Sequence, residues 1–250
     1  MDNNKIWNDN WKEIAEYGTK SAGNRWAFYL IRKILKNIVL DADSVIMDVG
    51  CGMGNKSAEL AKLFPDNVVY GIDFSTEGIK FASEYYASMH NLRFVCDDAR
   101  NVSERNCEKV GLLSSFELLE HIEDWENLLH DFCTISSRYI LISTPTGRMR
   151  EYEIDLGHYR NFKKGELESF MYSHGFRKVD VMYAGFPFWS PITRDLTNRR
   201  NLKCKDMGKD IKNELVITTN PIVHNITYFL YRNLSFDRIG DQFMGLFEKK

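Results

Sequence analysis

A ten-residue segment, Val45 to Gly54, constrains the fold of this chain more than any other. A mostly apolar stretch ends at Val49, and glycines follow at alternate positions, Gly50, Gly52 and Gly54. Glycine adopts the backbone angles of a tight turn and lets the main chain approach a ligand closely. A helix that begins at about Asn55 would direct its unpaired N–H groups to the same place. The segment predicts a buried strand, a ligand-binding turn and a helix.

Short apolar runs recur along the chain after this first one, and helical patterns lie between them. The clearest helical pattern spaces Trp125, Leu128, Leu129 and Phe132 on one face, with Asp124 as the expected N-cap. Another runs from about 164 to 174 and should end at Gly175. The alternation predicts an α/β, doubly wound sheet that binds its ligand beyond the carboxyl ends of the strands. The further expected strands are Asn67 to Ile72, Leu92 to Cys96, Val110 to Ser115, Arg138 to Ser143 and Lys178 to Tyr183.

The segments outside this core suggest one domain with additions at both ends. We expect residues 1–42 to form an N-terminal helical cap, in which Trp7, Trp11 and Tyr17 either pack or cover the ligand. Residues 43–184 form the cofactor-binding core. Residues 185–240 form a helical insertion before the last strand, because its prolines cannot lie inside a central strand. Residues 241–250 form the final strand, expected at an edge of the sheet.

Composition excludes several classes of protein. The 250 residues carry a formal net charge of −2, with basic residues scattered along the chain, so we expect no nucleic-acid partner. No secretion signal or apolar span is visible, which predicts a cytoplasmic protein without stable membrane association. Five cysteines without a Cys-x-x-Cys pair indicate free thiols and no metal site. Monomer and homodimer both stay open.

Acidic residues follow the second and third expected strands. Asp73 stands about 20 residues after the glycine turn, where a carboxylate can accept both hydroxyls of a ribose. Asp98 is placed to accept a hydrogen bond from an adenine amino group. A nicotinamide dinucleotide is disfavoured, since its Gly-x-Gly-x-x-Gly fingerprint would need glycine where Asn55 stands. The pattern predicts an adenosyl ligand.

These motifs resemble those of the class I S-adenosylmethionine-dependent methyltransferases. The resemblance covers roughly 43–181 and is closest to the small-molecule branch that includes ubiquinone-pathway and sugar methyltransferases. The Asp/Asn-Pro-Pro-aromatic element of DNA amino-methyltransferases is missing, because the fourth strand ends in Ser-Ser-Phe-Glu117. The motifs that carry the resemblance are Asp48-Val-Gly-Cys-Gly-Met-Gly54, Gly71-Ile-Asp73-Phe-Ser, Asp97-Asp98-Ala99, Phe116-Glu-Leu-Leu-Glu-His121-Ile and Gly157-His-Tyr-Arg-Asn-Phe-Lys-Lys-Gly-Glu-Leu167.

The resemblance implies a seven-stranded, mostly parallel sheet whose last strand is antiparallel. It implies S-adenosylmethionine as the cofactor and S-adenosylhomocysteine as its product. The glycine turn would contact the methionine moiety, Phe74 would stack on the adenine, and 115–117 would approach the methionine end. The cofactor-binding residues expected on this basis are Asp48, Gly50, Cys51, Gly52, Gly54, Asp73, Phe74, Asp98, Ala99, Ser115, Phe116 and Glu117.

The acceptor side of the site is less constrained by sequence. Two histidines are catalytic candidates: His158 as a base or substrate contact, and His121 chiefly to orient its loop. Each could instead be a loop histidine that only bonds its neighbours. An anionic acceptor could be held by Arg148, Arg150 and Arg160, or these could be solvated surface charges. Substrate contacts are expected from Tyr159, Arg160, Phe186 and Trp189.

Together these residues predict an enzyme that methylates an oxygen or nitrogen of a small polar metabolite, such as a sugar or a surface-glycan precursor. Two alternatives stay open. One is a non-catalytic partner subunit that binds the cofactor. The other is a protein or RNA methyltransferase.

Overall fold

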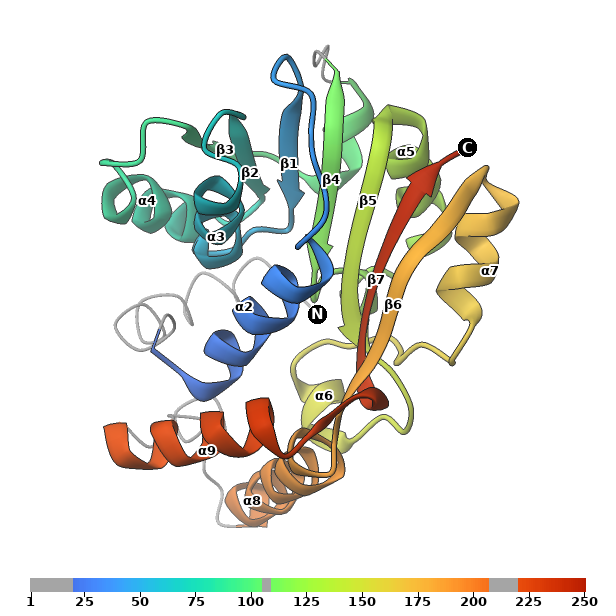
Figure 1. The fold of residues 1–250 in the computed structure, drawn as a ribbon. Coiled ribbons are helices and arrows are strands. Elements are labelled where there is room, and N and C mark those ends of the chain that lie inside the picture. The colour runs from blue at the N-terminus through green and yellow to red at the C-terminus, as the bar shows by residue number, and fades with distance from the viewer. Residues whose placement is uncertain (1–19, 105–108, 207–219) are drawn as a thin grey trace.

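The computed structural model describes residues 20–104, 109–206 and 220–250, which are built around one seven-stranded sheet (Figure 1). The strand order is β3-β2-β1-β4-β5-β7-β6, and β1 to β5 pair in parallel. This confirms the predicted doubly wound, mostly parallel sheet. The strands are β1 (Val45–Val49), β2 (Val69–Asp73), β3 (Leu92–Cys96), β4 (Val110–Phe116), β5 (Ser136–Pro145), β6 (Phe176–Phe186) and β7 (Phe236–Lys249).

The final strand differs from the prediction in position and length. It is antiparallel, as expected, but it lies between β5 and β6 and not at an edge. It also begins at Phe236, inside the segment that we assigned to the insertion. Its run from Gln242 to Phe247 is buried, and it pairs with β5 on one side and with β6 on the other.

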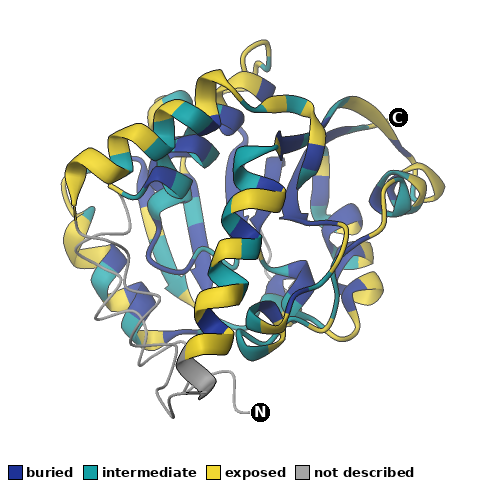
Figure 2. Cartoon of the chain, turned by 90° about the horizontal axis from the view of Figure 1, so that it is seen from below, coloured by how far each residue is buried: buried dark blue, intermediate teal, exposed yellow. Residues whose placement is uncertain are grey.

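Helices cover both faces of the sheet because successive strand residues point to opposite sides. In β1, Ile46 belongs to the apolar cluster under α2 (Ala22–Ile34) and α3 (Asn55–Leu63). Its neighbour Met47 belongs to the cluster under α5 (Trp125–Ile135) and α7 (Glu166–Ser173). A further helix, α4 (Thr76–Tyr85), packs against β2 and β3. Figure 2 shows the buried segments in the sheet and the exposed outer turns of the helices.

Local sequence explains where several helices begin and end. The hydroxyls of Ser21 and Ser75 accept hydrogen bonds from backbone N–H groups in the first turns of α2 and α4. The last turn of α7 is followed by Gly175 at φ 83°, as predicted. Asp124 precedes α5 as predicted, although its carboxylate accepts from the Asn127 side chain and not from the backbone.

The insertion lies at the carboxyl ends of the parallel strands (Figure 1). It comprises η3 (Phe188–Thr193), α8 (Arg194–Asp206) and α9 (Pro221–Asn233), and α9 contacts α2. Buried Arg194 pairs with buried Glu153 of α6 (Glu151–Asp155), which joins α8 to α6. Among the described helices, none has the length and apolar character needed to span a bilayer.

The prediction that Trp7, Trp11 and Tyr17 pack or cover the ligand falls on residues outside the described part of the chain.

Candidate functional site

The glycine turn has the conformation that its sequence requires. Gly50, Gly52 and Gly54 have φ values of 76°, 54° and 75°, a left-handed region that other residues rarely adopt. The N–H groups of Gly50 and Cys51 both donate to the carbonyl of Ile72, at 2.8 and 3.0 Å. This holds the turn against the end of β2. The turn leads directly into α3. The first N–H groups of a helix suit an anionic or polar ligand group.

Asp48 supports the turn from inside the sheet. It is 1% exposed, and its carboxylate accepts hydrogen bonds from Ser57 Oγ at 2.6 Å and Ser114 Oγ at 2.9 Å. Burial raises the pKa of Asp48 to about 6. Because α3 carries Ser57 and β4 carries Ser114, the carboxyl links both to β1.

Asp73 closes the turn from the neighbouring strand. Its Oδ2 accepts from the N–H of Gly52 and its Oδ1 from the N–H of Ser75, both at 2.8 Å. Burial raises the pKa of Asp73, and the two backbone donors oppose that rise. Each carboxylate oxygen has a second lone pair, so both can accept one more hydrogen bond from a ligand hydroxyl.

A cavity of about 510 Å³ lies beyond the ends of β2, β3 and β4, and neither the glycine turn nor Asp73 lines it. It brings together residues from four predicted motifs. The Asp98 carboxylate in its wall accepts from Arg100 Nε at 2.9 Å, and this guanidinium lowers the pKa of Asp98. The predicted residues that line this cavity are Phe74, Asp98, Ala99, His121 and Tyr159.

A second, smaller cavity of about 200 Å³ lies on the other side of the β4 terminus. At this terminus Glu117 has φ 57°, the single positive value for a non-glycine residue in the described part of the chain. Its Oε1 accepts from Ser143 Oγ and Gln242 Nε2, both at 2.7 Å. The cavity is therefore aromatic with one fixed carboxylate. Its lining includes Trp26, Lys56, Phe116, Glu117, Ser143, Trp189 and Gln242.

Other predicted residues lie away from these cavities. Ser115 is buried within β4, and Phe186 stacks on Phe236 with ring centroids 6.4 Å apart, so neither lines them. Arg160 donates to the carbonyl of Glu123 at 2.6 Å. Arg150 is buried and pairs with Asp195, which leaves it an internal ion pair and not an anion clamp. The exposed Arg148 pairs with the same aspartate.

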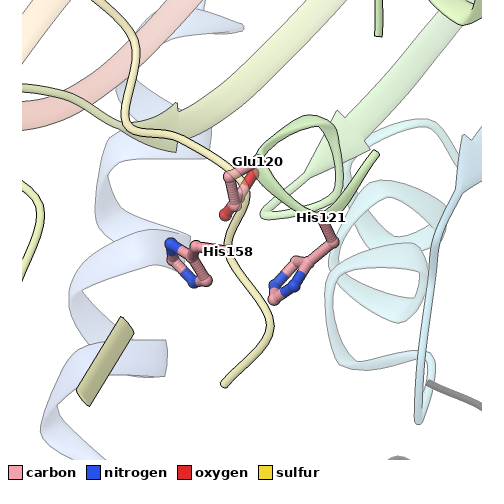
Figure 3. A group of neighbouring side chains, drawn as sticks. All are labelled: Glu120, His121 and His158. Carbon is pink, nitrogen blue, oxygen red and sulfur yellow. The ribbon is translucent and has the colours of Figure 1, made fainter. Parts of the chain in front are cut away.

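The two catalytic candidates lie together beside a buried glutamate (Figure 3). The rings of His121 and His158 have centroids 4.6 Å apart and are nearly perpendicular. His121 and Glu120 come from the short helix η2 (Leu119–His121), whereas His158 follows α6. Sequence spacing gave no hint of this group, because His158 joins it from a distant part of the chain.

Burial dominates the protonation of this group. It lowers the pKa of His121 to about 3, with help from His158, and it lowers the pKa of His158. Both imidazoles are therefore neutral near pH 7. Burial also raises the pKa of Glu120 well above its usual range, and the negative charge of Glu117 adds to the rise.

Five site residues were missed from the sequence: Trp26, Lys56, Glu120, Ser143 and Gln242. Glu120 lies in the motif Phe116-Glu-Leu-Leu-Glu-His121-Ile, next to a candidate histidine. That position was the only sequence feature that could have indicated its role. Gln242 becomes a neighbour of Glu117 because β7 inserts beside β5, so the wrong position for β7 led us to miss it. Ser143 instead lies opposite Phe116 in the β4–β5 pair.

Comparisons with known proteins agree with this geometry. A family described as methyltransferase domain matches residues 46–136. A malonyl-[acyl-carrier protein] O-methyltransferase from Marinomonas sp. (strain MWYL1) is 28% identical over 83 residues, which are 32% of this chain and 31% of the relative. A tRNA (guanine-N(7)-)-methyltransferase from Edwardsiella ictaluri (strain 93-146) is 26% identical over 160 residues, 60% of this chain and 64% of the relative. The chain thus spans less than two thirds of each.

Solved structures extend the likeness to the whole sheet. Magnesium protoporphyrin IX methyltransferase from Synechocystis PCC 6803, solved with bound S-adenosylhomocysteine, has a TM-score of 0.53 and 17% identity. The superposition covers 72% of this chain and 89% of that one. At this identity the likeness concerns the fold, which agrees with the domain matched at 46–136.

Proposed function

We propose that this chain, which carries a class I S-adenosylmethionine-dependent methyltransferase domain, transfers a methyl group to an oxygen or nitrogen of a small polar metabolite. Domains of this class use S-adenosylmethionine as the methyl donor. The observation that carries the proposal is the pair of cavities that flank the β4 terminus. One suits the adenosyl group and the other suits an acceptor.

The cofactor assignment combines the lining of the larger cavity with Asp73 and the glycine turn, which lie outside that lining. Asp73 would accept the ribose hydroxyls through its remaining lone pairs, and Phe74 would stack on the adenine. Asp98 and Ala99 would meet the polar edge of the base. Gly50 to Gly54 would contact the methionine moiety, which brings the sulfonium to the end of β4.

The smaller cavity supports a small acceptor. Its 200 Å³ is below the ~300 Å³ at which drug-sized ligand pockets begin. Trp26 and Trp189 provide rigid apolar walls that exclude water, and Glu117 provides one oriented acceptor of hydrogen bonds. A hydroxyl or an amine that donates to Glu117 would point its lone pair away from the carboxylate and toward the methyl group.

Bound S-adenosylmethionine supplies an electrophilic methyl on sulfur, and the side chains of this chain supply alignment. Alignment alone can lower the barrier by about 7 to 11 kcal/mol. A hydroxyl acceptor also loses a proton, and His158 is the better of the two candidate bases. Its pKa is lowered but Asn161 and nearby acids oppose the drop, whereas the pKa of His121 falls to about 3.

A nucleic-acid acceptor is the second candidate, because a tRNA methyltransferase is among the relatives. Against it stands the net charge of −2. A third reading, a cofactor-binding subunit without transfer activity, is opposed by the intact glycine turn and acids.

Radiolabelled S-adenosylmethionine distinguishes these functions. The purified protein is incubated with the labelled donor and either a metabolite extract or total tRNA, and products are separated by size. Label in a small molecule is expected. Label confined to tRNA would favour the second candidate, and no labelled product alongside tight cofactor binding would favour the subunit without activity.

A further inference from the structure

Glu120, His121 and His158 form the most unusual side-chain group in the described structure. One ligand-type atom from each of the three lies within 4.8 Å of the other two. Figure 3 shows the carboxylate and both imidazoles converging from η2 and from the loop after α6. Ligands bound to zinc at ~2 Å in a tetrahedral shell are about 3.4 Å apart, so small side-chain rotations would close the group around an ion.

The glutamate lacks a counterpart for its buried charge. Glu120 is 0% exposed, and its Oε2 accepts from Thr144 Oγ1 at 3.0 Å. Its Oε1 is also buried and has no hydrogen-bond partner among the described residues. An unpaired carboxylate oxygen at such depth is costly unless it is protonated or binds a cation. In Figure 3 the carboxylate points toward the space between the rings.

The histidine on the other side of this space is oriented for ligation. His158 Nδ1 lies 3.4 Å from Asn161 Oδ1, and Asn161 Nδ2 in turn donates to Glu153 at 3.0 Å. A hydrogen bond at Nδ1 fixes the tautomer that presents Nε2 to a metal, an arrangement typical of metal-binding histidines.

We propose that Glu120, His121 and His158 bind a divalent transition-metal ion beside the methyl-transfer centre, in which state His158 is a ligand and not the general base considered above. Two imidazoles and one carboxylate suit zinc, iron or manganese better than magnesium or calcium, which prefer oxygen ligands alone. Three protein ligands leave coordination positions for another molecule. His121 and Tyr159 line the larger cavity, so the group is reached from the cofactor side.

Cobalt(II) provides a direct probe of this site. The full-length protein is stripped with a chelator and titrated with Co²⁺, whose visible absorption reports nitrogen and oxygen ligation, and zinc affinity is measured by competition. The variants are Glu120→Gln and His158→Ala, with His90→Gln as the control because His90 is exposed and does not belong to the group. Circular dichroism verifies that each variant folds.

We expect one Co²⁺ per chain in the wild-type protein and in His90→Gln. Affinity should fall by at least ~100-fold in Glu120→Gln and in His158→Ala, since even supporting residues of metal sites contribute ~10–100-fold. Absence of stoichiometric binding by the wild-type protein, or equal affinity in all four proteins, would overturn the site. S-adenosylmethionine titrated into the same samples separates the two proposals: cofactor binding without cobalt binding removes only the metal, and the reverse removes only the methyltransferase function.

Discussion

Two buried aspartates on neighbouring parallel strands illustrate how position decides the role of a residue. Asp48 lies inside β1, and both of its oxygens are used by serine hydroxyls of the protein. Asp73 ends β2, where each of its oxygens accepts one backbone N–H group and keeps a second lone pair. The first therefore stabilises the turn, and we expect the second to bind a ligand.

Replacing Asp73 with alanine should weaken S-adenosylmethionine binding by about 10- to 100-fold. The loss corresponds to ~1.5–3 kcal/mol for hydrogen bonds to a charged acceptor. Calorimetric titration measures it, with exposed Asp66→Ala as the control. Equal affinity in a folded Asp73→Ala protein would show that the ribose is bound elsewhere.

Asp48 should make stability depend on pH. Its pKa rises from 3.8 to about 6 on folding, so the folded state binds the extra proton and loses stability as pH rises through that interval. Above pH 6 the ionised carboxyl of Asp48 lowers the free energy of unfolding by up to about 3 kcal/mol. Asp48→Asn should match the wild-type free energy of unfolding near pH 4 and exceed it above pH 6. Urea unfolding at both pH values checks this, and a difference independent of pH would refute the assigned cause.

At the scale of elements, the strand, turn and helix from β1 to α3 could be predicted because every residue there obeys a local rule. The same is true of the strands that the sequence displays as uninterrupted apolar runs. The position of β7 could not be predicted in this way. Its run from Gln242 to Phe247 indicates a buried strand, but only pairing with both β5 and β6 shows that it is interior.

The glycine turn provides a matched test of steric crowding. A Cβ added at Gly54 would lie 2.4 Å from ring carbons of Phe94, whereas one added at Gly165 would meet nothing within 4 Å. Both glycines have positive φ, at 75° and 85°. Gly165→Ala should cost ~1–2 kcal/mol from backbone conformation alone. Gly54→Ala should cost a further ~1–3 kcal/mol from overpacking.

Chemical denaturation of the two variants measures this difference. Equal losses of unfolding free energy would mean that the Phe94 ring moves aside at no cost, and that its contact does not define the turn.

At the scale of the whole molecule, the site depends on contacts that join distant parts of the chain. Trp26 of α2, Trp189 of the insertion and Tyr231 of α9 meet with ring centroids 5.5 to 5.7 Å apart. Aromatic residues near 186–189 suggested an acceptor wall, and Trp189 lines the smaller cavity while Phe186 does not. Sequence alone could not separate them, since their orientation depends on how the insertion folds back on α2.

Trp189→Ala should therefore affect the two cavities unequally. Removing a large aromatic side chain from this cluster should lower the free energy of unfolding by about 3 kcal/mol. The affinity for S-adenosylmethionine should stay within about twofold of wild type, because Trp189 borders only the acceptor side. Unfolding curves and calorimetry on one preparation test both parts, and weakened cofactor binding would show that the cavities are not separate.

The most direct test of the account is a titration of the wild-type chain with S-adenosylhomocysteine and, separately, with NADH, monitored by calorimetry and thermal unfolding. The account predicts one S-adenosylhomocysteine per chain and, at 100 times its Kd, a stabilisation of about 2.7 kcal/mol, with no response to NADH. Failure to bind S-adenosylhomocysteine, or saturable binding of NADH in its place, would contradict the account.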